Sequence, residues 1–110
     1  MLALVGVLAE ACGGPPAANC PAVPAGCPAP APSYATTIAP IIQNRCISCH
    51  SPAGQEPSKP YGTYADVKKL QIDILVQVRG CLMPPAGAAP LTDQEKIDLV
   101  GWLYCDGPNN

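Results

Sequence analysis

The 110-residue chain has no phenylalanine, and aromatic residues make up only 5% of it. Its hydrophobic fraction of 48% is inflated by alanine. A core built from such small side chains is marginal for one small domain, and domains of this kind usually add disulfides, a metal or a bound cofactor. The seven cysteines indicate that stabilising elements of this kind are present.

Charge and long apolar runs are also scarce. The formal net charge of −2 provides no basic surface, which argues against a nucleic-acid partner. The apolar run Met1–Ala9 is far shorter than the roughly 20 residues of a membrane-spanning helix, but it has the length of the apolar region of a secretory signal. Ala9-Glu10-Ala11 then offers an A-x-A type cleavage site, so we expect residues 1–12 to be a signal or anchor segment.

The residues after this run leave three possibilities for the start of the mature protein. Cys12-Gly13-Gly14 resembles the beginning of a mature bacterial lipoprotein, in which the new N-terminal cysteine carries lipid. Cys12 is therefore a candidate lipid anchor. The alternatives are a cleaved signal followed by a soluble exported protein, and a retained segment that packs on a partner.

Proline dominates the next segment, residues 13–33, which holds seven of the fifteen prolines and no charged side chain. Proline fixes φ and removes a backbone donor, so this segment cannot form a continuous helix or a central strand. We interpret it as a semi-rigid extended tether that precedes a domain in residues 34–110. Cys20 and Cys27 within it can close a small loop or bridge to a partner.

The only histidine of the chain directly follows two cysteines in Cys46-Ile47-Ser48-Cys49-His50. A structural zinc site needs four Cys or His ligands, usually in two close pairs, and the chain has no second C-x-x-C. A thioredoxin-like redox pair requires a βαβ context, which is not visible here. The pattern C-x-x-C-H is that of covalent haem c attachment. Two thiols one helical turn apart can reach one edge of a porphyrin, and the adjacent imidazole then reaches the iron.

A second iron ligand is available in Met83, the only methionine besides Met1. An isolated methionine is more often a filler of the core. Met83, however, lies in a loop bounded by Gly80 and by Pro84-Pro85 rather than on an apolar helix face. We therefore interpret Met83 as the distal axial ligand.

Three segments carry helix signals, and they predict an all-α fold. Residues 36–46 form a short helix capped by Thr36 or Thr37, with Pro40 in the first turn. Thr63 to Asp66 matches a capping box that opens one helix or two short ones. Thr92 to Glu95 is a full capping box, followed by an apolar stripe that includes Ile97, Val100, Tyr104 and, beside them, Leu99, Trp102 and Leu103.

In this order of elements, residues 34–110 resemble a small monohaem cytochrome c of the His/Met type. The resemblance implies an all-α fold wrapped around one covalently attached haem. It also assigns the ligands: Cys46 and Cys49 for the thioethers, His50 as the proximal ligand and Met83 as the distal ligand, so that His50 and Met83 hold the iron.

The resemblance carries two further structural expectations. Cys81 and Cys105 are similar to a pair found in a bacterial subset of these proteins, which implies a disulfide between them. Members of the family also hydrogen-bond the proximal histidine to a backbone carbonyl, for which Pro57 and Pro60 are the candidates. A disulfide and haem c attachment both imply a periplasmic or other extracytoplasmic location, where disulfides persist.

The implied function is electron transfer rather than enzymatic catalysis, by a periplasmic carrier or by a cytochrome subunit of a respiratory or photosynthetic membrane complex. The partners would be redox proteins. The alternative is a haem enzyme, or a gas or redox sensor, in which Met83 is displaced from the iron. The basic side chains Lys59, Lys68, Lys69, Arg79 and Lys96 are expected to lie on a solvated surface without a strong steering patch.

Overall fold

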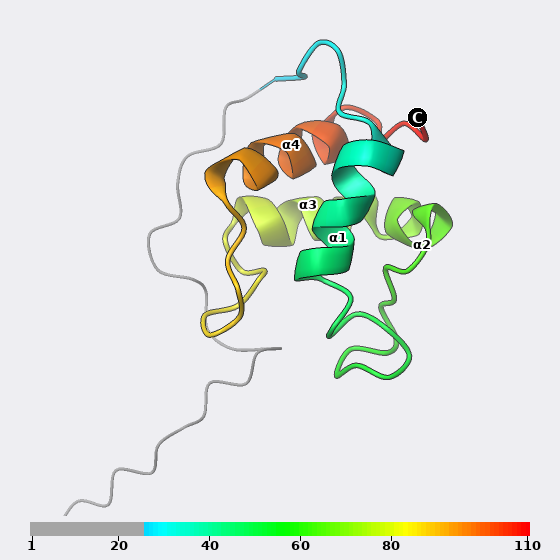
Figure 1. Ribbon diagram of the computed structural model, residues 1–110, viewed down its shortest axis with the longest axis vertical. Coiled ribbons are helices and arrows are strands. Elements are labelled where there is room, and N and C mark those ends of the chain that lie inside the picture. The colour runs from blue at the N-terminus through cyan, green and yellow to red at the C-terminus, as the bar shows by residue number, and fades with distance from the viewer. Residues whose placement is uncertain (1–25) are drawn as a thin grey trace, which may run out of the picture.

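The structure is a computed structural model that describes residues 26–110, and this part of the chain contains helices and no strand (Figure 1). The expected all-α class is thus confirmed. The elements are a π-helical turn η1 (Tyr34–Ile38) and the helices α1 (Ala39–Arg45), α2 (Tyr64–Lys69), α3 (Gln71–Arg79) and α4 (Asp93–Tyr104). Among these elements, none combines the length and the apolar character that crossing a membrane would require. Cys12, Cys20 and the expected signal segment lie outside the described residues.

The first helical segment begins earlier than Thr36 or Thr37. Its cap is Ser33, whose side chain accepts a hydrogen bond from the Thr36 amide at 3.2 Å. The next amides are satisfied from the far end of the chain: Tyr34 N donates to Asn110 Oδ1, and Ala35 N donates to the Asn110 carbonyl, both at 3.0 Å. The prediction of the cap was wrong, since Ser33 rather than Thr36 or Thr37 caps the segment.

The other two predicted caps are confirmed. Thr63 accepts from the Asp66 amide at 3.1 Å, and α2 ends at Leu70, so that two short helices follow this cap. Thr92 and Glu95 form the complete capping box at the start of α4. Because both signals lie within four consecutive residues, the local sequence was sufficient to predict them.

The core lies where α4 packs against α3 and η1. Trp102 and Leu99 are fully buried, and the indole N–H of Trp102 donates to the Pro108 carbonyl at 2.9 Å. The rings of Tyr34 and Tyr64 pack beside the indole, with centroids 5.5 and 6.2 Å from it. Tyr104, expected on the apolar stripe, is 56% exposed, because the buried face of α4 is centred on the side chains of Leu99, Val100, Trp102 and Leu103.

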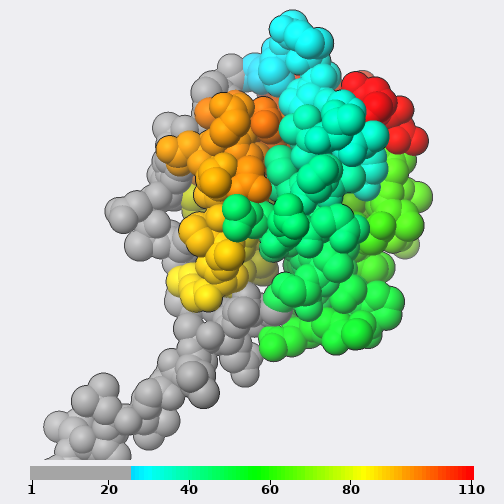
Figure 2. All heavy atoms as spheres, viewed as in Figure 1, coloured from blue at the N-terminus to red at the C-terminus, as the bar shows by residue number. Residues whose placement is uncertain are grey.

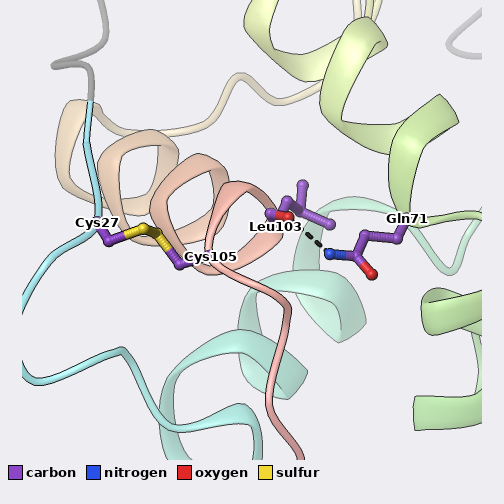
Figure 3. Close-up of a disulfide and its surroundings, with 4 residues drawn as sticks. All are labelled: Cys27, Gln71, Leu103 and Cys105. Atoms are coloured by element: carbon purple, nitrogen blue, oxygen red, sulfur yellow. Dashed lines mark hydrogen bonds between the residues drawn. A yellow bond between two sulfur atoms is a disulfide. The ribbon is translucent and has the colours of Figure 1, made fainter.

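A disulfide joins Cys27 to Cys105 at the end of α4 (Figure 3). The expected Cys81–Cys105 bridge is therefore wrong, and so is a loop closed between Cys20 and Cys27. The segment after Cys27 lies against α4, where a Cβ atom on Gly101 would be 2.9 Å from the ring of Pro28. Gly101 thus permits the close approach of this segment, which brings Cys27 within reach of Cys105.

Candidate functional site

A cavity of about 240 Å³ lies between two loops and the helices α1, α3 and α4. One loop follows α1, the other follows α3, and both lie at the same end of the molecule (Figure 1), where they form the green and yellow surface in Figure 2. All four residues expected to hold a haem line this cavity: Cys46, Cys49, His50 and Met83. Its apolar walls include Ile74, Val78, Pro85, Leu91 and Leu99.

The C-x-x-C-H segment reaches the cavity because the chain continues to coil after α1. The Cys46 amide donates to the Ile42 carbonyl at 2.9 Å, and the amides of Cys49 and His50 both donate to the Cys46 carbonyl, at 3.2 and 3.0 Å. This turn places the two cysteines and the histidine together on the cavity wall.

The two cysteines of this segment differ in chemical state. Cys46 is a free cysteine, and burial raises the pKa of its thiol to about 12, so the thiol stays protonated at neutral pH. Cys49 is disulfide-bonded. Attachment of a group through both sulfur atoms therefore requires that Cys49 first be reduced to a thiol.

The imidazole of His50 is buried and held in one tautomer. Its Nδ1 lies 2.9 Å from the Lys59 carbonyl oxygen, which can only accept, so Nδ1 carries the proton. Nε2 then bears a lone pair, and no hydrogen bond engages it within residues 26–110. This is how proteins commonly orient a histidine that ligates a metal. The expected carbonyl of Pro57 or Pro60 does not serve, since the bond goes instead to Lys59, the residue that precedes Pro60.

The loop that carries Met83 is fastened to the end of α3. The amides of Leu82 and Met83 both donate to the Gln77 carbonyl, at 2.8 and 3.1 Å. Cys81 has a φ of 55°, and its sulfur lies 2.8 Å from the Nζ atom of Lys96 on α4. The expected role of Lys96 as a solvated surface charge is wrong: it is buried, and burial lowers the pKa of its amine. A contact from Lys96, rather than a bridge to Cys105, thus joins this loop to α4.

Gly54 is a site residue that the sequence reasoning missed. A Cβ atom built on it would lie 2.2 Å from the Cys49 carbonyl oxygen and 2.8 Å from that of Ser48. The amide of Glu56 also donates to the Cys49 carbonyl at 2.9 Å. The loop after His50 therefore folds back tightly on the C-x-x-C-H backbone, and only glycine allows this approach.

The charges near the cavity are few and largely compensated. Arg45 lines the cavity and pairs with Glu95, with Nη2 2.9 Å from Oε1, and this contact lowers the pKa of the Glu95 carboxyl. Glu56 is the other charged residue of the wall. The second loop, residues 80–92, contains no charged side chain, and the first loop, residues 46–63, contains only Glu56 and Lys59.

Comparison with protein-family models, with curated proteins and with solved structures finds no match to this chain. In residues 26–110, no group of three or more His, Cys, Asp or Glu side chains is arranged to hold a metal ion. The cavity and the residues that line it are therefore the features that indicate a function.

Proposed function

We propose that the protein is an electron carrier with one haem c, bound covalently through Cys46 and Cys49 and held by His50 and Met83. One observation carries the proposal. Met83, the only methionine apart from Met1, folds into the same cavity as the single C-x-x-C-H motif, although thirty-odd residues separate the two. This shared cavity favours the ligand role of Met83 over that of a core filler, which is the commoner role of an isolated methionine.

The residues present fit such a group in donor chemistry and in surroundings. The open Nε2 of His50, the thioether of Met83 and an apolar wall are what a haem of this kind requires. The cavity volume of about 240 Å³ lies just below the 300–1,000 Å³ typical of ligand pockets. We therefore expect the Met83 loop to lie further out in the loaded protein.

The chain's own residues would set the electron-transfer properties. The Lys59 carbonyl accepts a hydrogen bond from Nδ1 and so would keep Nε2 available to the iron. Ile74, Val78 and Leu99 are buried on the wall and exclude water, which favours the reduced state. When bound, the haem supplies a reversible one-electron change, and with two protein ligands on its iron it leaves no open position for a substrate.

The site of action is proposed to be periplasmic or otherwise extracytoplasmic, with redox proteins as partners. The Cys27–Cys105 disulfide supports this location, because such bonds persist in oxidising compartments. Mass spectrometry of the mature N-terminus tests whether Cys12 carries lipid. A lipid mass on Cys12 would favour a membrane-anchored carrier or complex subunit over a soluble one.

The decisive experiment compares Met83→Ala with Leu82→Ala, an exposed neighbour in the same loop. Both proteins should retain covalent haem on a denaturing gel. Only Met83→Ala should lower the midpoint potential and lose the long-wavelength absorption band of Met-ligated ferric haem. A colourless wild-type protein, or an unchanged potential in Met83→Ala, would overturn the assignment. If the wild-type protein lacks this band, Met83 is displaced and the enzyme or sensor alternative is favoured.

A further inference from the structure

The imidazole of His50 has a second neighbour besides the Lys59 carbonyl. The ring of Tyr61 lies parallel to it, with a centroid separation of 4.0 Å and an angle of 17° between the planes. Tyr61 is itself buried, at 7% exposure, and lines the same cavity. Burial raises the pKa of its phenol above the ordinary value.

Two hydrogen bonds to backbone carbonyls hold the rings of His50 and Tyr61 beside each other. The Tyr61 amide donates to the His50 carbonyl at 3.0 Å, while His50 Nδ1 donates to the Lys59 carbonyl at 2.9 Å. The segment 59–61 therefore contacts His50 at three places: its carbonyl oxygen, its Nδ1 atom and the face of its ring. Lys59 is in turn linked to α3 by an ion pair with Asp73 at 3.3 Å.

The hydrogen bond to Lys59 leaves one motion of the imidazole unrestrained. It fixes the direction of Nδ1 and selects the tautomer, but the ring can still pivot about the line that joins Nδ1 to the carbonyl oxygen. A flat ring packed parallel to the imidazole at 4.0 Å blocks this pivot, because tilting would drive the edge of one ring into the face of the other.

We infer that Tyr61 is a positioning residue for the iron ligand: its ring fixes the plane of the His50 imidazole, while the Lys59 carbonyl fixes its tautomer. The inference rests on the proposed function, since it concerns the orientation of the ligand in the cavity. The stacking acts through the aromatic ring and not through the hydroxyl, which has no hydrogen bond to any of residues 26–110. Phenylalanine at position 61 should therefore preserve the orientation of the His50 imidazole, and leucine should not.

The test uses the protein as purified from cells, in three variants. Tyr61→Phe keeps the ring, Tyr61→Leu removes it but keeps an apolar side chain, and Tyr64→Leu removes a tyrosine from the separate cluster around Trp102. In the oxidised, haem-bearing protein, the spread of the haem-methyl proton resonances reports the orientation of the axial imidazole. Tyr61→Leu should change this spread and the midpoint potential, whereas Tyr61→Phe and Tyr64→Leu should match the wild type.

Two results would overturn the inference. One is a Tyr61→Leu protein with the wild-type resonance spread, and the other is a Tyr61→Phe protein that behaves like Tyr61→Leu. If Tyr61→Leu accumulates poorly, Tyr61→Met, which is flexible and apolar, provides the same comparison.

A protein purified without haem would refute the proposed function and still test the stacking. The chain has a single histidine, so its imidazole signals are unambiguous. A ring stacked at 4.0 Å should shift the imidazole carbon-bound protons upfield in wild type and Tyr61→Phe, and not in Tyr61→Leu. Equal imidazole shifts in all three proteins would contradict the positioning role independently of any haem.

Discussion

Removing the Cys27–Cys105 disulfide should destabilise the domain more than any single side-chain truncation on its surface. The two cysteines are separated by 78 positions. For a closed loop of this length the chain-entropy relation gives a stabilisation of about 4.5 kcal/mol, since the bond mainly restricts the unfolded chain. Small domains have a total stability of roughly 5–15 kcal/mol, so the serine variants should be close to unfolding at room temperature.

The assay is urea unfolding of Cys27→Ser, Cys105→Ser and the double variant. Because either serine breaks the same bond, all three should lose nearly the same free energy, and a double-mutant cycle should show strong non-additivity. Trypsin cleaves after Arg45, Arg79 and Lys96, so it distinguishes a Cys105 partner within residues 1–45, which include Cys27, from Cys81 in residues 80–96. A loss below about 1 kcal/mol in the variants, or a non-reduced peptide joining Cys81 to Cys105, would refute the reasoning.

Three further predictions concern the site and its surroundings. Gly54→Ala should destabilise the protein by more than about 2 kcal/mol and reduce haem incorporation, because the added methyl group would collide with the Cys49 carbonyl. Gly62→Ala is the control, since Gly62 has open space around it, and it should behave like the wild type in the same unfolding and haem-staining assays. The Arg45 contact lowers the pKa of the Glu95 carboxyl. The ion pair therefore stabilises the fold fully above the ordinary carboxyl pKa of 4.5, and this stabilisation is lost as the pH falls through the lowered pKa. In thermal unfolding, Glu95→Gln should lose more stability at neutral pH than at pH 3. Because few charged side chains line the cavity and Arg45 among them is paired with Glu95, stopped-flow rates of electron exchange with a redox partner should change less than about twofold between low and physiological salt, and a tenfold change would reveal electrostatic steering.

The features that the sequence predicted correctly are those determined by nearby residues. The caps at Thr63 and Thr92 each bond an amide three positions away, so four consecutive residues contain the whole signal. The cap at Thr63 left open whether one helix or two short ones follow, and the structure shows two, α2 and α3. His50 and Met83 line one cavity, but their role as haem ligands stays a prediction.

The errors arose where a distant residue decides the outcome. Cysteine spacing cannot determine pairing, and Cys105 bonds Cys27 because Gly101 lets the incoming segment lie against α4. Lys96 follows a capping box on a helix face that reads as polar, yet the neighbouring Cys81 loop covers it. Neither the packing of a loop nor the path of an extended segment leaves a local sequence pattern.

The fluorescence of the buried Trp102 indole reports on the state of the domain. It is the only tryptophan in the chain, and it lies one helical turn beyond Leu99, which forms part of the cavity wall. Its emission should shift to longer wavelength when the domain opens to water. A pigment bound beside Leu99 would instead quench that emission without shifting it, so one fluorescence spectrum distinguishes an unfolded chain, a folded empty one and a folded, loaded one.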